Sequence, residues 1–137
     1  MSEETRCKMY EIAKYLGELN AKDKVKKFGG EKGYAKVYQI IPGCSIWVHH
    51  LSNDRLIIDL QIGEAASDKF SEEGLNGEAE LIKKFKNFFN NEVSQETFYH
   101  PLDGSGAVRY YKNISDEPLN SILERLQELE QNFSNSR

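Results

Sequence analysis

The stretch CSIWVHHLSNDRLIIDLQI, residues 44–62, decides the fold because it contains two β-like runs joined by a polar turn. Every second residue from Leu56 to Ile62 is Leu or Ile, which is the period-two pattern of a strand with one covered face. The first run, residues 44–50, is rich in β-branched and aromatic side chains. These residues predict a β-hairpin, and its apolar side requires helices to cover it.

The segments around this hairpin supply helices and further strands. Apolar residues at three- and four-residue spacing predict helices over residues 3–20, 79–89 and 115–133, the last with Ser115 as N-cap and Pro118 in its first turn. Further strands are predicted over residues 34–41, 95–100 and 107–112, and an acidic loop over 63–76. The order αβββαββα favours an α+β fold, with an antiparallel five-stranded sheet covered by helices mainly on one face.

Length and composition indicate a single α+β domain that spans residues 1–137. With 39% hydrophobic and 29% charged residues, the chain is too apolar and too periodic to remain disordered. No apolar run approaches the roughly 20 residues that cross a bilayer, and the N-terminus is acidic, unlike a signal peptide. We therefore expect a cytoplasmic protein without a membrane partner, in which Cys7 and Cys44 serve as packing residues.

The net charge of −4 is unevenly distributed along the chain. Residues 1–40 carry nine Lys/Arg and six Asp/Glu, and the remainder carries nine and sixteen. Lys26 and Lys27 belong to a Lys/Gly-rich segment, residues 21–34, which could hold phosphate through ammonium and backbone N–H groups. The segment lacks the GxxxxGK[ST] order of a P-loop. Nucleic acid is not an expected partner, because binding it requires a larger basic excess.

The histidines are the strongest candidates for chemistry. His49 and His50 are neighbours in a strand, so they point to opposite faces and at most one belongs to any site. His100 could approach one of them if the two hairpins are neighbours, and Asp59 or Asp103 would then complete a metal or acid–base site. No Ser, Cys or His stands in a recognisable catalytic motif. We therefore predict no catalytic residue, no metal and no cofactor.

Aromatic and basic residues of the predicted strands form the candidate binding surface. If several of them reach the sheet face that helices leave uncovered, they form a platform for a base or for another protein. The candidate residues are Trp47, His50, Tyr99, Arg109, Tyr110, Tyr111 and Lys112, with Lys26 and Lys27 from the basic segment.

Three hypotheses about function follow. The favoured one is a small acidic protein-binding module that acts through a sheet face or the Leu-rich C-terminal helix, as inhibitors, immunity proteins and counter-defence proteins do. Its partner would be another protein, or a second copy of the chain in a homodimer. The second hypothesis is a protein that binds a small phosphorylated ligand or nucleotide with the Lys/Gly segment and the strand aromatics. The third is a hydrolase that combines His49 or His50 with His100, so enzymatic activity stays open although its absence is favoured.

Overall fold

A computed structural model of the protein describes residues 3–17, 33–51, 55–72, 77–99 and 106–134. The helices within these ranges are α1 (Glu3–Tyr15), α3 (Glu64–Glu72), α4 (Gly77–Phe88) and α5 (Leu119–Ser134). The strands are β1 (Gly33–Ile41), β2 (Cys44–His50), β3 (Leu56–Gly63), β4 (Ser94–Tyr99) and β5 (Gly106–Asn113). Lys26, Lys27, His100 and Asp103 lie outside the described residues, so the predictions about them find no test here.

The five strands form one antiparallel sheet in the order β1-β2-β3-β5-β4, which confirms the predicted α+β fold. The hairpin predicted from residues 44–62 is present, with Cys44 opposite Ile62 and His50 opposite Leu56. On its other side β3 pairs with β5, so that Asp59 lies opposite Tyr111. The hairpin therefore lies at the centre of the sheet. Strand β4 forms one edge, and the chain then returns as β5, which lies between β3 and β4.

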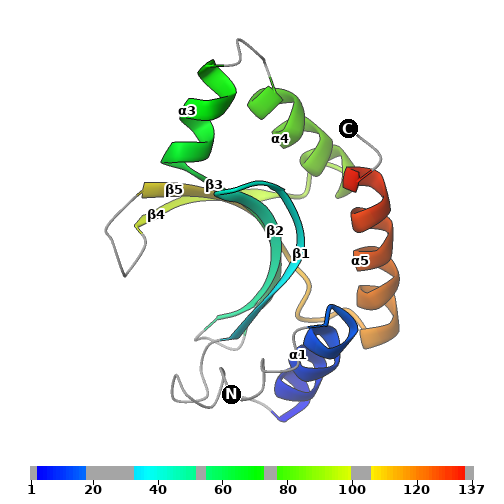
Figure 1. The fold of residues 1–137 in the computed structure, drawn as a ribbon. Helices are drawn as coiled ribbons and strands as arrows, with labels where there is room; N and C mark the ends of the chain where they lie inside the picture. Colours follow the sequence, from blue (N-terminus) through cyan, green and yellow to red (C-terminus); the bar gives the residue numbers. More distant parts are fainter. Residues whose placement is uncertain (1–2, 18–32, 52–54, 73–76, 100–105, 135–137) are drawn as a thin grey trace.

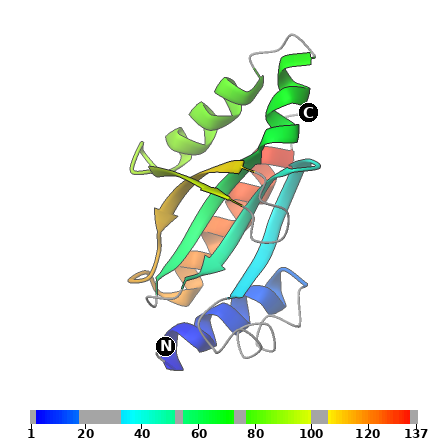
Figure 2. The ribbon, with the colours of Figure 1, turned by 90° about the vertical axis from the view of Figure 1, so that its left-hand side faces the viewer.

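The sheet is strongly curved, and the helices lie on its convex side (Figure 1). When the left-hand side of Figure 1 is turned towards the viewer, the strands stand in front and α5 runs behind them (Figure 2). We call the side turned away from α5 the concave face; it carries Tyr34, Lys36, Trp47, His49, Asp59, Gln61, Glu96, Phe98, Arg109 and Tyr111. None of the described helices is long and apolar enough to cross a membrane.

The core lies between the sheet and the helices. Leu56, Ile58 and Leu60 of β3 are fully buried, as the alternation predicts. The apolar stripe of α5 packs against this side, with Ile122, Leu126 and Leu129 at 0% exposure. Each such side chain contributes about 1.5–3 kcal/mol when fully buried. The C-terminal helix therefore uses its Leu-rich face to stabilise its own domain.

The segment after β3, predicted as a loop, begins instead with helix α3. Ala66 is buried at 1% exposure, and Phe70, one helical turn later, packs against the core. Two apolar contacts at i and i+4 are enough to fix a short helix whose other residues favour helix or tolerate it. The acidic composition of this segment concealed that spacing.

Two helix ends also differ from prediction. Helix α1 ends at Tyr15 rather than near Asn20, because Gly17 adopts a φ of 81°, a left-handed conformation that commonly ends helices. Ser115 does not cap α5, which begins at Leu119. Its hydroxyl oxygen accepts a hydrogen bond from the backbone N–H of Leu56 at 2.9 Å, so the residue joins the end of β5 to the start of β3.

Candidate functional site

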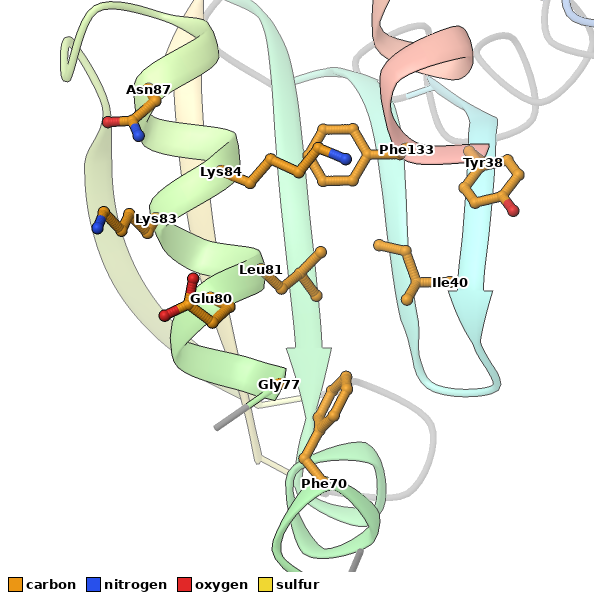
Figure 3. Close-up of a pocket in the computed structure, with 10 residues that line it drawn as sticks. All are labelled: Tyr38, Ile40, Phe70, Gly77, Glu80, Leu81, Lys83, Lys84, Asn87 and Phe133. Carbon is orange, nitrogen blue, oxygen red and sulfur yellow. The ribbon is translucent and has the colours of Figure 1, made fainter. Parts of the chain in front are cut away.

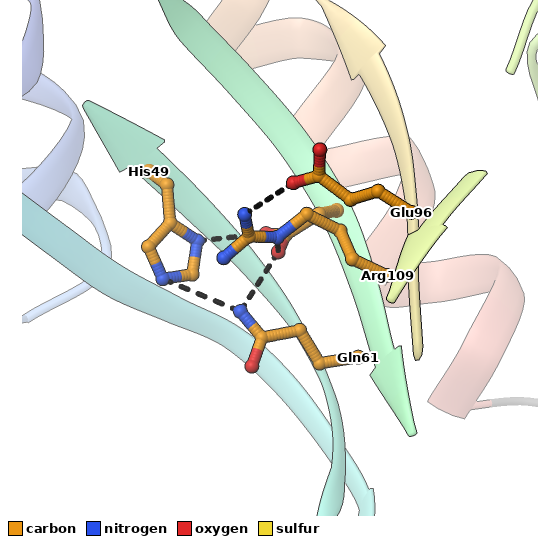
Figure 4. A network of polar contacts seen from close by, with 5 residues as sticks. His49, Gln61, Glu96 and Arg109 are labelled. Atoms are coloured by element: carbon orange, nitrogen blue, oxygen red, sulfur yellow. Dashed lines mark hydrogen bonds and ion pairs between the residues drawn. The ribbon is translucent and has the colours of Figure 1, made fainter. Parts of the chain in front are cut away.

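Five polar side chains from four strands meet on the concave face (Figure 4). They are His49 of β2, Asp59 and Gln61 of β3, Glu96 of β4 and Arg109 of β5. The register explains the meeting: Gln61 lies opposite Arg109, and Arg109 lies opposite Glu96. Residues that pair across an antiparallel sheet share a face, so these side chains must all project to the same side.

Asp59 is the centre of this network. Its side chain is fully buried, and its Oδ1 accepts a hydrogen bond from His49 Nδ1 at 2.8 Å. Its Oδ2 accepts from Gln61 Nε2 at 2.8 Å and from Arg109 Nε at 2.9 Å. A buried carboxylate is costly unless charge and hydrogen bonds compensate it, and three donors provide that compensation here.

Arg109 is fixed by both its charge and its shape. Nε donates to Asp59, Nη1 donates to Glu96 Oε1 at 2.7 Å, and the guanidinium lies 4.5 Å from the ring centre of Phe98. The side chain is 12% exposed, against 40% for Glu96. Among the described residues, no hydrogen bond of Nη2 accompanies these contacts. The guanidinium is thus held in one orientation with donor capacity remaining.

The hydrogen bonds determine the tautomer of His49. A carboxylate can only accept, so Nδ1 carries the proton that faces Asp59. In the neutral ring Nε2 is then an acceptor, and the Gln61 amide nitrogen lies 3.4 Å from it. The lone pair that a general base or a metal ligand would use is therefore turned towards a neighbouring amide.

Aromatic rings adjoin the network along β1 and β2. Tyr34 and Trp47 meet edge to face with ring centres 5.7 Å apart, and the ring of His49 lies 5.8 Å from that of Trp47. The ammonium group of Lys36 lies 5.0 Å from the centre of the Trp47 ring. Tyr34 is 36% exposed, so this aromatic group extends to the solvent-accessible part of the concave face.

The residues proposed from the sequence are divided between the two faces. Trp47, Arg109 and Tyr111 lie on the concave face. The remaining four described candidates project to the helix-covered side, as their registers require; they are His50, Tyr99, Tyr110 and Lys112. The structure thus places Trp47, Arg109 and Tyr111 on one face of the sheet and the other four on the opposite face.

Each of these four residues has a structural setting of its own. His50 is 1% exposed and Tyr110 is 9% exposed, so both are part of the packed interior. Lys112 pairs with Glu92 at 2.9 Å, and this contact lowers the pKa of the Glu92 carboxyl group. Tyr99 is 73% exposed at the end of β4, far along the sheet from Trp47 in strand order.

The sequence interpretation missed the partners of Arg109 and chose His50 rather than His49. The alternation of β3 already placed Asp59 and Gln61 opposite the apolar side chains, which was a usable signal for the uncovered face. The expected separation of His49 and His50 is observed, since one faces the concave side and the other the core. His49 contacts Asp59, one of the two carboxylates that the sequence indicated for a site with a second histidine, but that second histidine, His100, lies outside the described residues.

The other reactive groups are poorer candidates for chemistry. The Cys44 thiol is buried, and burial together with the nearby charge of Glu78 raises its pKa from 9.0 to about 12. A thiol of this kind stays protonated near neutral pH and is a poor nucleophile. Within the described ranges, no group of three or more His, Cys, Asp or Glu side chains is arranged to hold a metal ion.

Comparison with protein-family models, with curated proteins and with solved structures found no match.

Proposed function

We propose that this protein is a binding module that recognises another protein through the concave face of its sheet. The observation that carries the proposal is the fixed Arg109 guanidinium, which Asp59, Glu96 and Phe98 hold in place. Arginine, tryptophan and tyrosine dominate the energetics of protein interfaces. A side chain that is already ordered loses little conformational entropy on binding, so its contacts convert efficiently into affinity.

The aromatic neighbours support the same interpretation. Trp47 is only partly buried and Tyr34 is exposed, although both have ring partners. Large aromatic side chains supply rigid, amphipathic area with few torsions to order. Together with Arg109 they combine the residue types that are enriched at interface cores.

The charge balance indicates which chemistry this surface accepts. The positive charge of Arg109 faces two carboxylates, those of Asp59 and Glu96. A phosphate group placed there would approach both carboxylates, whereas a neutral carbonyl oxygen would accept a hydrogen bond from Nη2 without that repulsion. A polypeptide offers such oxygens at every residue, so a protein segment suits the surface better than a nucleotide.

The sheet face is also favoured over the C-terminal helix. The stripe of α5 that could serve as a docking surface is buried, with Leu126 and Leu129 at 0% exposure. Exposing it would remove a large part of the core.

The test is variant-dependent co-purification from the host cell. Tagged wild-type protein, Trp47→Ala and Lys14→Ala are purified in parallel, and the co-purifying proteins are quantified by mass spectrometry. Lys14 is exposed on α1, so its variant controls for effects unrelated to the concave face. The proposal expects at least one protein that is retained by wild type and Lys14→Ala and lost with Trp47→Ala. Identical protein sets for all three samples would contradict it.

A second candidate function, hydrolysis by an acid–base pair, is favoured by the 2.8 Å contact between His49 and Asp59. In such a pair the carboxylate orients the imidazole, which then moves a proton through Nε2. Here Nε2 would have to release the Gln61 amide first. Turnover of ester or phosphodiester substrates that His49→Asn abolishes, while the variant stays folded, would establish this function in place of the binding proposal.

A further inference from the structure

We propose that a cavity on the helix-covered side binds an amphipathic carboxylate, that is, an alkyl chain with one anionic head group. The cavity has a volume of about 530 Å³ and lies between α3, α4, the end of α5 and strand β1 (Figure 3). This volume is within the range of about 300–1,000 Å³ that is typical of small-molecule sites. The site is separate from the concave face, so the proposal does not depend on the protein-binding function.

The apolar part of the cavity is assembled from four different elements. Phe70 of α3, Leu81 of α4 and Ile40 of β1 surround the same space, and Phe133 of α5 lies above it in the view of Figure 3. None of these side chains carries a polar group. A ligand that fills this space must therefore be largely hydrocarbon.

The polar part of the cavity is cationic. Lys84 crosses from α4 to α5, where its Nζ donates to the backbone carbonyl of Asn132 at 2.5 Å and lies 4.8 Å from the ring centre of Phe133 (Figure 3). Both partners are neutral, and among the described residues no carboxylate forms an ion pair with Lys84 or with its neighbour Lys83. Glu80 is the one acidic residue of the lining, so the lysines leave an excess of positive charge beside the apolar space.

An apolar space beside positively charged lysines favours one class of ligand. An anionic head group would pair with the Lys84 ammonium while the attached chain displaces water from Ile40, Leu81 and Phe70. A neutral hydrocarbon would displace the same water but would form no ion pair with Lys84. A nucleotide could place its phosphate at the lysines, but the apolar side chains of Ile40, Leu81 and Phe70 would offer its base no hydrogen bond.

The probe is decanoate, and its neutral counterpart is 1-decanol. Binding is followed by NMR of the methyl groups of Ile40 and Leu81, since the single tryptophan, Trp47, lies on the opposite face and cannot report on the cavity. We expect saturable shifts of both methyl groups with decanoate and distinctly weaker binding of 1-decanol. Equal affinity for the two probes, or shifts that neither saturate nor include these methyl groups, would overturn the proposal.

Two matched variants identify the head-group contact. Lys84→Met removes the charge but keeps an unbranched side chain, and we expect decanoate binding to weaken about fivefold, the effect of a partly exposed ion pair. Lys86→Met makes the same change on α4 at a residue that lies over Tyr110 and does not line the cavity. It should leave decanoate binding unchanged; an equal loss in both variants would refute a specific head-group site.

Discussion

Asp59 and His49 form a 2.8 Å hydrogen bond between β3 and β2, although the residue directly opposite Asp59 is Trp47. The contact is diagonal, and a second diagonal contact joins Asp59 to Arg109 of β5 at 2.9 Å. A single buried carboxylate thus connects the three central strands of the sheet. The network combines a structural role with the positioning of Arg109, the residue proposed to bind the partner, and the two roles can be separated by mutation.

Replacing Asp59 should destabilise the whole domain. Asp59→Asn leaves Arg109, which is only 12% exposed, without its central carboxylate, and removing one partner of a buried pair typically costs on the order of 3 kcal/mol. Urea denaturation measures the free energy of unfolding. The matched variant Glu96→Gln removes an acid that is 40% exposed and should cost no more than about 1 kcal/mol. Equal losses of unfolding free energy in the two variants would show that the buried carboxylate of Asp59 stabilises the protein no more than the exposed one of Glu96.

The two cysteines should differ sharply in reactivity. Cys44 is buried, as expected of a packing residue, and its pKa is raised to about 12. The same expectation was wrong for Cys7, which is exposed and should react quickly with a thiol reagent. Cys44 should therefore be labelled only when the protein unfolds. Mass spectrometry of the labelled protein would show one rapid modification, and a rapid second one would contradict the described core.

The stability of the protein at alkaline pH should also depend on Cys44. Because folding raises its pKa from 9.0 to about 12, the folded state favours the neutral thiol. Its contribution to stability is complete below pH 9.0 and is lost as the pH rises from there towards about 12. In Cys44→Val the alkaline loss of stability should be smaller. Part of the alkaline loss of stability should remain in this variant, because burial also raises the pKa of Tyr110.

Two glycines offer a test of the backbone. Gly43, in the turn between β1 and β2, has a φ of 87°, so Gly43→Ala forces a side chain into the left-handed region at a cost of about 1–2 kcal/mol. In Gly106→Ala the new Cβ would meet Glu64 Oε1 at 2.7 Å, but that atom is the end of a flexible side chain that can move away. Thermal unfolding should show a clear loss of stability for the first variant and little for the second.

The hydroxyl of Ser115 should be worth about 1–3 kcal/mol, because Ser115→Ala leaves the N–H of fully buried Leu56 without its acceptor. Ser71→Ala removes a hydroxyl that is exposed on α3 and bonds only within its own helix. Its free energy of unfolding should stay within about 0.5 kcal/mol of wild type. A Ser115→Ala variant with the unfolding free energy of wild type would contradict the described junction between β3 and β5.

The sequence predicted the sheet well because alternation is a local signal. The period-two pattern of residues 56–62 identified β3 and its buried side, and the spacing of Ile122, Leu126 and Leu129 identified the stripe of α5. Helix α3 was not predicted, because only Ala66 and Phe70 carry its apolar contacts within a polar segment.

The candidate site depended on information that is not local. Both sides of β2 are apolar, with Ile46 and Val48 on one and Trp47 on the other, so the sequence could not decide which histidine faces the helices. The contact of Arg109 with Asp59 requires that β5 pairs with β3, and 50 positions separate the two residues. Such pairing is set by the packing of the whole sheet rather than by any nearby residue.

The central claim, that the concave face contacts a protein in the cell, is tested most directly by photo-crosslinking in the host. A photo-crosslinking amino acid such as p-benzoylphenylalanine replaces Tyr34, which is 36% exposed beside Trp47. The same replacement at Tyr15, 46% exposed on α1, provides the control. The account predicts a discrete crosslinked protein from the Tyr34 position that the Tyr15 position does not give. A protein adduct from Tyr15 alone, or none from Tyr34, would contradict it.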